Sequence, residues 1–567
     1  MLKKDELKWV VGSSAPQEFL DRFPELHPIV AAILYHRGIE TQAEVDAYLS
    51  PDYARDQHDP YLFKDMKVAV DRIQHAVVEK QKVVVHGDYD ADGVCGASVL
   101  YTTLKAIGAD VSVYLPHRDT EGYGLNMNTV RTLKASGTHL VITVDCGISN
   151  APEVEEAVAL GMDVIVTDHH SEPPVLPSAA LAILNPKISG ETYPYKYLAG
   201  VGVAFKLSQA LARAYELGEA FEKWLLDLVA ISTITDFVPL TGENRVLEKF
   251  GLLVLRKNRR IGLREWCASN GIDPTKIDTT TIGFKLGPHI NAAGRLEHAN
   301  MAFEMMVSED PVKARESAEN LKHTNASRQK LSDSMSKDAL AQGEQQKGEQ
   351  VIIAIGKDWP VGLVGLVAGK VASTYQRPTF VISTSEDKIM GSGRSIEQFN
   401  LVEAMQSMPE VFEKYGGHPQ ACGFTIKDQP SLEQFTAHMR ERARSILEGA
   451  DLRKTLKIEC ELRVSDIDWK LVDMLQSCAP FGEGNPEPVF KISQATVEDF
   501  STIGKKGDHL RLSISHNGIT RKCIAFGAGH HSLNLHIGKV IDVAATVQIN
   551  EWNGNRDIQL ELKDIHL

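Results

Sequence analysis

The segment Val83–Gly93 reads VVVHGDYDADG and ends an apolar run with one imidazole and three carboxylates. These groups belong to His86, Asp88, Asp90 and Asp92. A packed core does not tolerate them, because they lose hydration and the carboxylates repel one another unless a positive charge lies among them. Carboxylate oxygens and imidazole nitrogens together suit a divalent cation. The segment therefore predicts a metal site at the end of a buried strand.

Three further apolar runs end in the same kind of residue. VITVD ends at Asp145, VIVTDHH ends in Asp168, His169 and His170, and ISTITD ends at Asp236. We expect all of these runs to be strands, so that each carries its polar groups at its carboxyl end. Ligands of open parallel sheets bind at that edge, where loops are held by a rigid scaffold. The four segments are therefore predicted to form one site.

The candidate ligands are more numerous than one ion needs, which favours two ions. A carboxylate that bridges two ions holds them about 3.5–4 Å apart, the spacing used for in-line attack at phosphorus. The absence of thiolate ligands favours Mn²⁺ or Mg²⁺ over structural zinc, and the imidazoles shift the preference toward Mn²⁺. The candidates are His86, Asp90, Asp92, Asp145, His169, His170 and Asp236.

Asp88 and Asp168 are expected to support the ligands and not to bind metal themselves. An aspartate that follows a strand is often a helix cap or a turn former, which suits Asp88. Asp168 is placed to hold a histidine ring in the tautomer that binds metal. Because consecutive residues point in different directions, one of His169 and His170 can bind metal while the other reaches the substrate.

The elements that position these residues follow an α/β pattern. From about residue 80 to 240, apolar runs alternate with helical stretches such as 96–104, as in a parallel sheet with covering helices. A later segment is rich in Ala, Glu, Lys, Gln and Ser and predicts a long helix, and the last part alternates like the strands of a small β-barrel, most simply an OB-fold. The predicted parts are an N-terminal helical lead-in (1–75), the metal domain (76–300), a connecting helix (301–350), a second α/β domain (351–450) and the barrel (455–567).

The second α/β domain carries three glycine-rich segments that suit phosphate binding. Residues 362–370 are interpreted as a loop that leads into a helix, and residues 391–395 as a turn that presents Ser392 and Arg394. The third segment, residues 416–418, ends in a histidine. Glycines let a backbone approach a ligand closely, while Ser, Arg and His supply donors to phosphate oxygens.

The composition fits a large enzyme but raises a question about nucleic acid. The chain has 567 residues, 43% hydrophobic, and a net charge of −14, which opposes binding to a polyanion. Basic residues must therefore be grouped locally, and the candidates lie near motif-like segments: Arg118, Arg295, Arg328, Arg377 and Arg394. The seven cysteines form no Cys-x-x-Cys pair, and no apolar stretch has signal or membrane-span length, so we expect a cytoplasmic protein.

At this point the chain resembles a known superfamily. Segments 86–93, 145–147, 168–170 and 235–236 are similar, in that order, to the four motifs of the DHH phosphoesterases. Segments 287–295 and 416–423 resemble the bacterial exonucleases of that superfamily that act on single-stranded DNA, and similarity extends through 480–488. The resemblance implies a DHH domain, a DHH-associated domain that holds the substrate against it, and the barrel.

The resemblance also implies an activity and a set of roles. We expect 5′→3′ hydrolysis of single-stranded DNA to mononucleotides, in DNA repair and recombination, with a single-stranded-DNA-binding protein and a RecQ-type helicase as partners. One ion is expected on His86, Asp90 and Asp145, and the other on Asp92, Asp145, His169 and Asp236, with His170 acting in catalysis. The expected substrate-binding residues are Arg118, Asn291, Arg295, Ser392, Arg394 and His418.

Two other interpretations remain open. The motifs also occur in DHH hydrolases of short oligonucleotides, cyclic dinucleotides or small phosphoanhydrides, although such substrates need no strand-binding barrel. Relatives that have lost ligands serve as non-catalytic DNA-binding scaffolds, but all candidate ligands are retained here.

Overall fold

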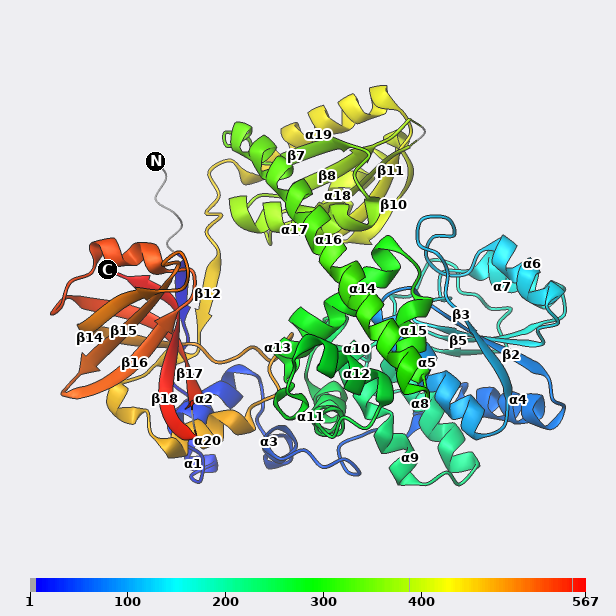
Figure 1. Ribbon diagram of the computed structural model, residues 1–567, viewed down its shortest axis with the longest axis horizontal. Coiled ribbons are helices and arrows are strands. Elements are labelled where there is room, and N and C mark those ends of the chain that lie inside the picture. Colours follow the sequence, from blue (N-terminus) through cyan, green and yellow to red (C-terminus); the bar gives the residue numbers. More distant parts are fainter. Residues whose placement is uncertain (1–6, 387, 553) are drawn as a thin grey trace. The chain divides into compact units, whose positions relative to one another are not determined.

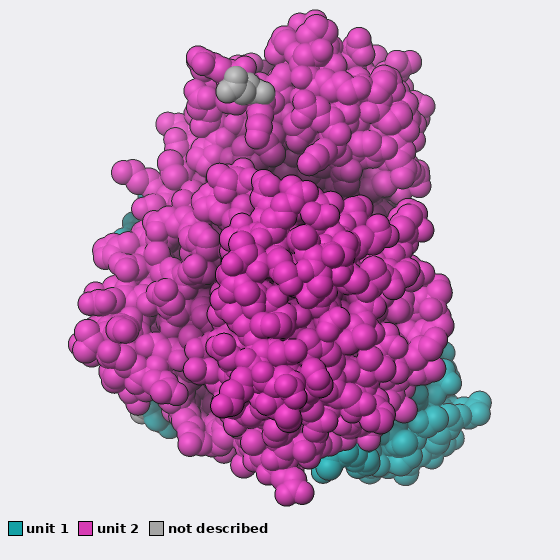
Figure 2. Space-filling model, turned by 90° about the vertical axis from the view of Figure 1, so that its right-hand side faces the viewer, with its two compact units in different colours: residues 1–56, 453–567 teal, residues 57–452 magenta. Residues whose placement is uncertain are grey.

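The computed structural model describes residues 7–386, 388–552 and 554–567 (Figure 1). The chain forms two compact units, which Figure 2 distinguishes by colour. Residues 57–452 make one unit, and residues 1–56 together with 453–567 make the other. No helix among the described residues combines the length and the apolar character that a membrane span requires.

The metal domain is built on a five-stranded parallel sheet in the order β3-β2-β4-β5-β6. Both faces of the sheet are covered, which suits strands made of apolar runs, and the central strand β4 is buried along its whole length. The strand order reverses between the adjacent strands β2 and β4, which creates a crevice at their carboxyl ends. The strands are β2 (Lys82–Gly87), β3 (Asp110–Tyr114), β4 (Leu140–Val144), β5 (Asp163–Thr167) and β6 (Ala182–Leu184).

Helices surround this sheet, and the domain continues as helices to residue 307 (Figure 1). The helix predicted over residues 96–104 is confirmed as part of α5 (Ala91–Ala106). The others are α4 (Met66–Val78), α6 (Met127–Ala135), α7 (Ala151–Ala159), α8 (Gly200–Ala214), α9 (Glu219–Trp224), α10 (Leu226–Thr235), α11 (Gly242–Arg256), α12 (Ile261–Asn270), α13 (Thr279–Thr281), the π-helical turn η3 (Ile282–Leu286), α14 (Gly287–Leu296) and α15 (Asn300–Val307).

The strand predicted to end at Asp236 is wrong. That run belongs to helix α10, which ends at Thr235. Every residue from Leu226 to Thr233 is buried, so this part of the helix is buried on all sides. A short apolar run buried all round has no helical periodicity and cannot be distinguished from a buried strand by pattern alone.

The predicted connecting helix is confirmed as α16 (Pro311–Gln345), whose 35 residues begin at the cap formed by Asp310. A second, mixed sheet follows in the order β10-β11-β9-β8-β7. Its strands are β7 (Ile352–Lys357), β8 (Thr379–Thr384), β9 (Ile389–Arg394), β10 (Phe412–His418) and β11 (Ala421–Ile426), with helices α17 (Val361–Tyr375), α18 (Leu401–Gln406) and α19 (Gln429–Leu447).

Two of the glycine-rich segments do not have the predicted local structure. Residues 362–370 lie inside helix α17, and residues 391–394 are part of strand β9, paired with β8 and β11. The glycines of β9 make room for aromatic rings: a Cβ on Gly391 would collide with Phe424, and one on Gly393 would lie 3.0 Å from the ring of Phe380. Glycine is therefore needed here for packing across a sheet face and not for a turn.

The other unit holds the C-terminal barrel. Strand β14 (Phe490–Ile503) pairs with both β15 (His509–His516) and β17 (Val540–Trp552), while β16 (Ile519–Ala525) pairs with β15 and β18, and β18 (Asn555–His566) pairs with β17. These pairings close a five-stranded barrel, as predicted. The predicted turn at 516–518 is confirmed, whereas Asn553 of the other predicted turn lies outside the described residues.

The N-terminal residues fold with the barrel. Strand β1 (Lys8–Val11) pairs in parallel with β12 (Thr455–Ile458). Apolar side chains of α1 (Gln17–Arg22), α2 (Pro28–His36) and α3 (Gln42–Leu49) share one buried cluster with α20 (Trp469–Ser477) and the barrel interior. The helices predicted at the N-terminus therefore complete a core whose other part lies some 400 residues later in the chain.

Candidate metal centre and substrate pocket

The loop after β2 is held by its own carboxylates. Asp90 caps helix α5, since its Oδ1 accepts hydrogen bonds from the amides of Asp92 (2.9 Å) and Gly93 (3.2 Å). Asp92 accepts from the amides of Gly200 (2.7 Å) and Val201 (2.8 Å) at the start of α8 and from the Ser232 hydroxyl. The amides at a helix N-terminus bind a carboxylate well, so the start of α8 holds the Asp92 side chain in the crevice.

Asp145 lies at the end of β4 in an uncommon backbone conformation. Its φ is +59°, which is unusual for a residue with a side chain. Gly200 packs directly against it, and a Cβ at that glycine would lie 2.6 Å from the Cβ of Asp145. The surrounding backbone therefore determines the direction of the Asp145 carboxylate, which is 3% exposed.

Asp168 organises the two histidines that follow it. Its Oδ1 accepts from the amide of His169 (2.7 Å) and from Nδ1 of His170 (2.8 Å), and its Oδ2 accepts from the amide of Ile148 (3.0 Å). Burial opposes ionisation of this carboxyl, but these hydrogen bonds and the His170 charge lower its pKa overall. The same hydrogen bond raises the pKa of His170 against the opposing effect of burial.

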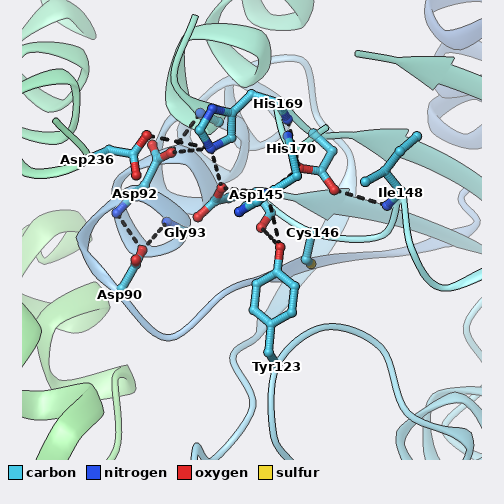
Figure 3. Close-up of polar contacts among 12 residues, drawn as sticks. Asp90, Asp92, Gly93, Tyr123, Asp145, Cys146, Ile148, His169, His170 and Asp236 are labelled. Carbon is cyan, nitrogen blue, oxygen red and sulfur yellow. Dashed lines mark hydrogen bonds and ion pairs between the residues drawn. The ribbon is translucent and has the colours of Figure 1, made fainter. Parts of the chain in front are cut away.

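His169 lies at the centre of the site, facing three carboxylates from three different segments (Figure 3). Its Nε2 is 3.2 Å from Asp145, 3.5 Å from Asp236 and 3.7 Å from Asp92. Burial lowers the pKa of His169 to about 4 although Asp92 opposes this, so the ring is neutral and its nitrogen can bind a cation. The residues predicted to converge from separate strands and from the segment ending at Asp236 do meet.

The carboxylates repel one another strongly. Burial, together with the charges of neighbouring aspartates, raises the pKa values of Asp88, Asp145 and Asp236 well above the usual range, and that of Asp90 is raised for the same reasons. Buried oxygens of Asp88, Asp145 and Asp236 and both ring nitrogens of His169 have no hydrogen-bond partner within the described residues. Unpaired buried acceptors with unfavourable charge are the property of a site built for a cation.

Three sets of side chains have donor atoms close enough to share an ion. The sets are Asp145 with His169 and His170, Asp92 with His169 and Asp236, and Asp88 with Asp90 and Asp145. Asp145 takes part in two of the three sets, as a bridging ligand would. The site therefore fits two divalent cations.

The placement of His86 and Asp88 differs from the predicted roles. His86 is completely buried in strand β2, stacks on Tyr114 with 5.5 Å between ring centroids, and belongs to none of the three sets. Its Nδ1 lies 3.7 Å from the Cys146 sulfur, and burial lowers its pKa to about 4. Asp88, which was predicted to support the loop, instead lies within reach of Asp90 and Asp145.

A cavity of about 590 Å³ opens beside these groups. The acidic side is formed by Asp88, Asp90, Asp145, Asp236 and His170. The facing residues include Arg118, Asn291, Arg295, Arg328 and Leu366. Leu366 lies on α17 of the second α/β domain, so the cavity is lined by both domains of the unit.

The arginines gather without acidic partners. Arg118 lies over the Tyr89 ring at 5.0 Å, Arg295 donates to the carbonyl of Gly362 (3.0 Å), and Arg328 donates to the Asn325 side chain (2.8 Å). Burial and the neighbouring arginines lower the pKa of Arg295 to about 10. Within the described part of the chain none of these guanidinium groups forms an ion pair with a carboxylate, which leaves them available to a phosphate.

The remaining predicted substrate residues have varied positions. Asn291 accepts from the amide of Ala91 (2.8 Å) and so ties α14 to the loop after β2. Arg394 donates to the Ser392 hydroxyl (3.0 Å), and both side chains lie against Gly365 of α17. Arg394 is close enough to Arg295 to lower the pKa of that residue, but neither Arg394 nor Ser392 lines the cavity. His418 is exposed at the end of β10 and does not line it either.

Sequence reasoning missed two residues that contact the site. The Tyr123 hydroxyl donates to the carbonyl of Asp145 (2.9 Å) and lies 3.1 Å from Nδ1 of His170 (Figure 3). Phe237 follows Asp236 and lines the cavity. Tyr123 lies in a glycine-flanked loop, EGYG, which was the available signal, whereas the sequence around Phe237 gave none.

Three family descriptions match successive parts of the chain. The DHH family N-terminal domain matches residues 82–233, the DHHA1 domain matches residues 348–445, and the RecJ OB domain matches residues 458–564. The order and positions of the matches agree with the two α/β domains and the barrel.

Relatives are similar to this chain over nearly its whole length. The single-stranded-DNA-specific exonuclease RecJ of Bacillus subtilis is 38% identical over 99% of this chain and 71% of its own length, and that of Dickeya dadantii is 31% identical over 96% of each chain. The crystal structure of Thermus thermophilus RecJ in complex with Mn²⁺ superposes with a TM-score of 0.84 at 28% identity, covering 99% of this chain and 79% of that one. The chain thus belongs to the RecJ family of the DHH superfamily.

Proposed function

We propose that this chain is a single-stranded-DNA-specific exonuclease that uses two Mn²⁺ or Mg²⁺ ions and removes mononucleotides from the 5′ end. The observation that carries the proposal is the cavity in which a carboxylate and imidazole cluster faces unpaired arginines. One side is suited to cations and the other to phosphate, which is the arrangement that phosphodiester hydrolysis needs. The relatives named as RecJ exonucleases support the assignment.

The metal-binding residues fit two cations, as their unpaired buried donor atoms indicate. Asp92, His169 and Asp236 would hold one ion, and Asp88, Asp90 and Asp145 the other, with Asp145 also within reach of His169 of the first group. Bound divalent cations acidify a coordinated water and polarise the phosphoryl oxygens. RecJ of Thermus thermophilus has been crystallised with Mn²⁺ and with Mg²⁺, which supports these ions.

The protein groups around the cations have separate tasks. Arg118, Arg295 and Arg328 hold the phosphate and stabilise the charge that develops on its oxygens during attack. Asp168 orients His170 toward the cavity and raises its pKa, which favours the form of the ring that can donate a hydrogen bond to the substrate. Tyr123 fixes the Asp145 backbone and contacts His170. The charged groups are therefore preorganised before substrate binds.

The barrel supports a polymeric substrate. Residues 458–564 match the RecJ OB domain, and OB-folds bind single strands by combining a basic groove with aromatic stacking. A hydrolase of cyclic dinucleotides or small phosphoanhydrides has no need of such a domain. A non-catalytic scaffold has no need of a retained carboxylate and histidine cluster with unpaired donor atoms.

The 5′→3′ polarity rests on the arginine group. A terminal 5′-phosphate carries more negative charge than an internal phosphodiester, and several guanidinium groups without acidic partners favour it. Arg394 and Ser392 would complete this pocket if the second α/β domain moved closer, since Arg394 already influences Arg295. Roles in cytoplasmic DNA repair and recombination, beside a single-stranded-DNA-binding protein and a RecQ-type helicase, complete the proposal.

One experiment separates these functions. The full chain with Mn²⁺ is incubated with a long single strand labelled at its 5′ end and with the same strand labelled at its 3′ end. The proposed function predicts immediate release of labelled mononucleotide from the first substrate and progressive shortening of the second. The reverse pattern would give the opposite polarity. A labelled dinucleotide is incubated in parallel: its cleavage without any product from the long strands would indicate a small-substrate enzyme, and no product from any substrate would indicate a scaffold.

A further inference from the structure

Two phenylalanine side chains are highly exposed beside the metal residues. Phe237, the residue after Asp236, is 75% exposed, and Phe284 is 81% exposed. Large apolar rings are usually buried, because an exposed ring loses the free energy that folding gains from removing apolar surface from water. One of them at the edge of a polar cavity and the other on the turn beside it indicate a ligand with an apolar face.

Phe237 is presented to the cavity by the end of helix α10. It follows the C-cap residue Asp236, has a φ of +57° and lines the cavity. This helix-ending position is normally occupied by glycine, because a residue with a bulky side chain is strained there. The backbone therefore holds an exposed ring in a place where a smaller residue would end the helix more easily.

Phe284 lies on the adjoining π-helical turn η3. Ile282 and Leu286 of this turn are buried, while Phe284 between them points to solvent. The turn packs on the end of α10, since a Cβ at Gly283 would lie 3.5 Å from Ile234. Gly283 lines the same cavity as Phe237. Single π-helical turns are frequent at functional sites, and this one carries an exposed ring next to the cavity.

We propose that Phe237 and Phe284 form a stacking surface for unpaired nucleobases of the strand whose phosphates bind the arginines of the cavity. This inference rests on the proposed function and deepens it. The arginines and carboxylates account for phosphates and cations but offer no apolar surface to the bases. A phenylalanine ring does so without hydrogen bonds to base edges, so the surface accepts any base.

The same surface contributes to the choice of single strands. A base in a duplex is stacked on both faces and cannot lie on a phenylalanine ring without leaving its neighbours, which costs free energy. An unpaired base has a face available. The two rings therefore favour single-stranded DNA at the point of cleavage, in addition to any selection by the barrel.

The test compares kcat/KM for strands in which one nucleotide at a time, from the first to the sixth position after the 5′ end, is replaced by an abasic analogue. The wild-type enzyme should lose roughly tenfold in kcat/KM at the positions that stack on the rings. Phe237→Ala should lose a similar factor on the intact strand, mainly through a higher KM, and should show no further loss at its abasic position. Phe284→Ala should behave likewise, and Phe237→Trp should retain the wild-type pattern.

The matched control is Tyr61→Ala, which removes a 43% exposed ring of the same unit that does not line the cavity. Its kcat/KM and its abasic profile should stay at wild-type values. If the double variant Phe237→Ala/Phe284→Ala keeps wild-type kcat/KM and the wild-type abasic penalty, the stacking surface is ruled out. Absence of product from wild-type protein would instead contradict the proposed function, so the two failures are distinguishable.

Discussion

Oδ1 of Asp145 lies 3.2 Å from Nε2 of His169, although the two residues follow different strands. Strands β4 and β5 are adjacent and parallel, with Val144 paired to Thr167, so the residues that come next leave the sheet together. His169 is neutral because burial lowers its pKa to about 4, and no hydrogen bond to this Asp145 oxygen is found among the described residues. The contact is therefore a pair of cation ligands held together by strand register.

Asp145→Asn should abolish hydrolysis while the protein stays folded. The loss of kcat with Mn²⁺ should exceed the roughly 10–100-fold typical of residues that only support a ligand, because Asp145 takes part in two of the three sets of metal donors. Turnover is measured with saturating Mn²⁺ on a long single strand. Asp110→Asn, which changes an exposed carboxylate at the opposite end of the sheet, serves as control, and equal turnover of the two variants would remove Asp145 from the site.

The same variant should alter how stability depends on pH in the metal-free protein. Burial and neighbouring aspartates raise the pKa of Asp145 in the folded state, so between the unfolded value of about 3.9 and that raised value the folded state binds more protons. This group therefore destabilises the fold at neutral pH, and its contribution improves as pH falls through the raised pKa. The Asp145→Asn variant lacks this charge and therefore lacks the destabilisation that the charge causes.

The measurement is the midpoint of thermal unfolding in chelator, taken from pH 8 to pH 5 for both proteins. Asp145→Asn should be the more stable of the two at pH 8, and the difference should shrink as pH falls. Histidines distant from the site contribute the same pH dependence to both proteins and cancel in the difference, which therefore reports Asp145 together with the aspartates and histidines that its charge influences. An advantage of the variant that grows toward acid pH would contradict the assigned shift.

Mn²⁺ affinity should increase with pH for a related reason. Asp88, Asp145 and Asp236 have raised pKa values and must lose protons to bind the ions, whereas His169 is already neutral. Calorimetric titration in buffers of different ionisation enthalpy should detect protons released on binding at pH 7. The release should be smaller for Asp145→Asn, and unchanged release would show that Asp145 is not protonated before binding.

Asp168→Asn tests the support given to His170. The variant keeps the shape of the side chain but removes the charge that raises the pKa of His170. Activity should fall by about 10–100-fold, and the alkaline limb of the pH–rate profile, where His170 loses its proton, should move to lower pH. His170→Gln should remove this limb altogether. A drop in rate without any movement of the profile would indicate that Asp168 serves only the backbone of the loop.

The strand-borne parts of the site could be predicted from the sequence, and the helix-borne parts could not. The carboxylates that follow the apolar runs of β2, β4 and β5 can be recognised as site residues from the sequence, because apolar β-branched runs form buried strands and parallel strands end on one edge of the sheet. Asp236 was assigned to the site correctly but to the wrong element, because a helix buried on all sides lacks a periodic pattern.

Other features depend on tertiary packing that no local pattern records. The glycines of β9 leave room for the rings of Phe380 and Phe424, which come from neighbouring strands. In the sequence the spacing of these glycines resembles that of a turn, and the rings that require them are not part of the local pattern. The exclusion of His86 from the metal sets depends on how deeply its ring is buried against Tyr114. The association of residues 1–56 with the barrel depends on contacts between distant parts of the chain.

That association determines how the role of the barrel can be tested. Removal of residues 453–567 alone would expose the apolar faces of α1 and α2, which pack in the barrel cluster. The fragment 1–452 should therefore aggregate, because these apolar faces would be exposed. The fragment 57–452 is a compact unit by itself and should unfold cooperatively. Fragment 57–452 should cleave short oligonucleotides, bind long strands more weakly and show a smaller salt dependence of binding. Wild-type affinity of this fragment for a long strand would make the barrel a structural domain only.

The last prediction concerns the 5′ end. Arg394 is half-buried, donates to Ser392 and the carbonyl of Gly393, and has no acidic partner among the described residues. Burial lowers the pKa of this guanidinium, which indicates that its charge is poorly compensated in the free protein. A terminal phosphate would compensate it, and a hydrogen bond to a charged group contributes about 1.5–3 kcal/mol. Arg394→Gln should therefore reduce the preference for 5′-phosphorylated over 5′-hydroxyl strands by about 10–150-fold.

The comparison uses kcat/KM for the two strands with each protein, so that any general loss of activity cancels in the ratio. Arg377→Gln, which changes another arginine of the same domain outside the cavity lining, should leave the ratio unchanged. Arg295→Gln should reduce activity on both strands, because Arg295 lies on the cavity wall and would hold the scissile phosphate as well. Equal losses on both strands for Arg394→Gln would assign it to the general phosphate site, and the polarity would then have to come from the direction in which the strand is bound.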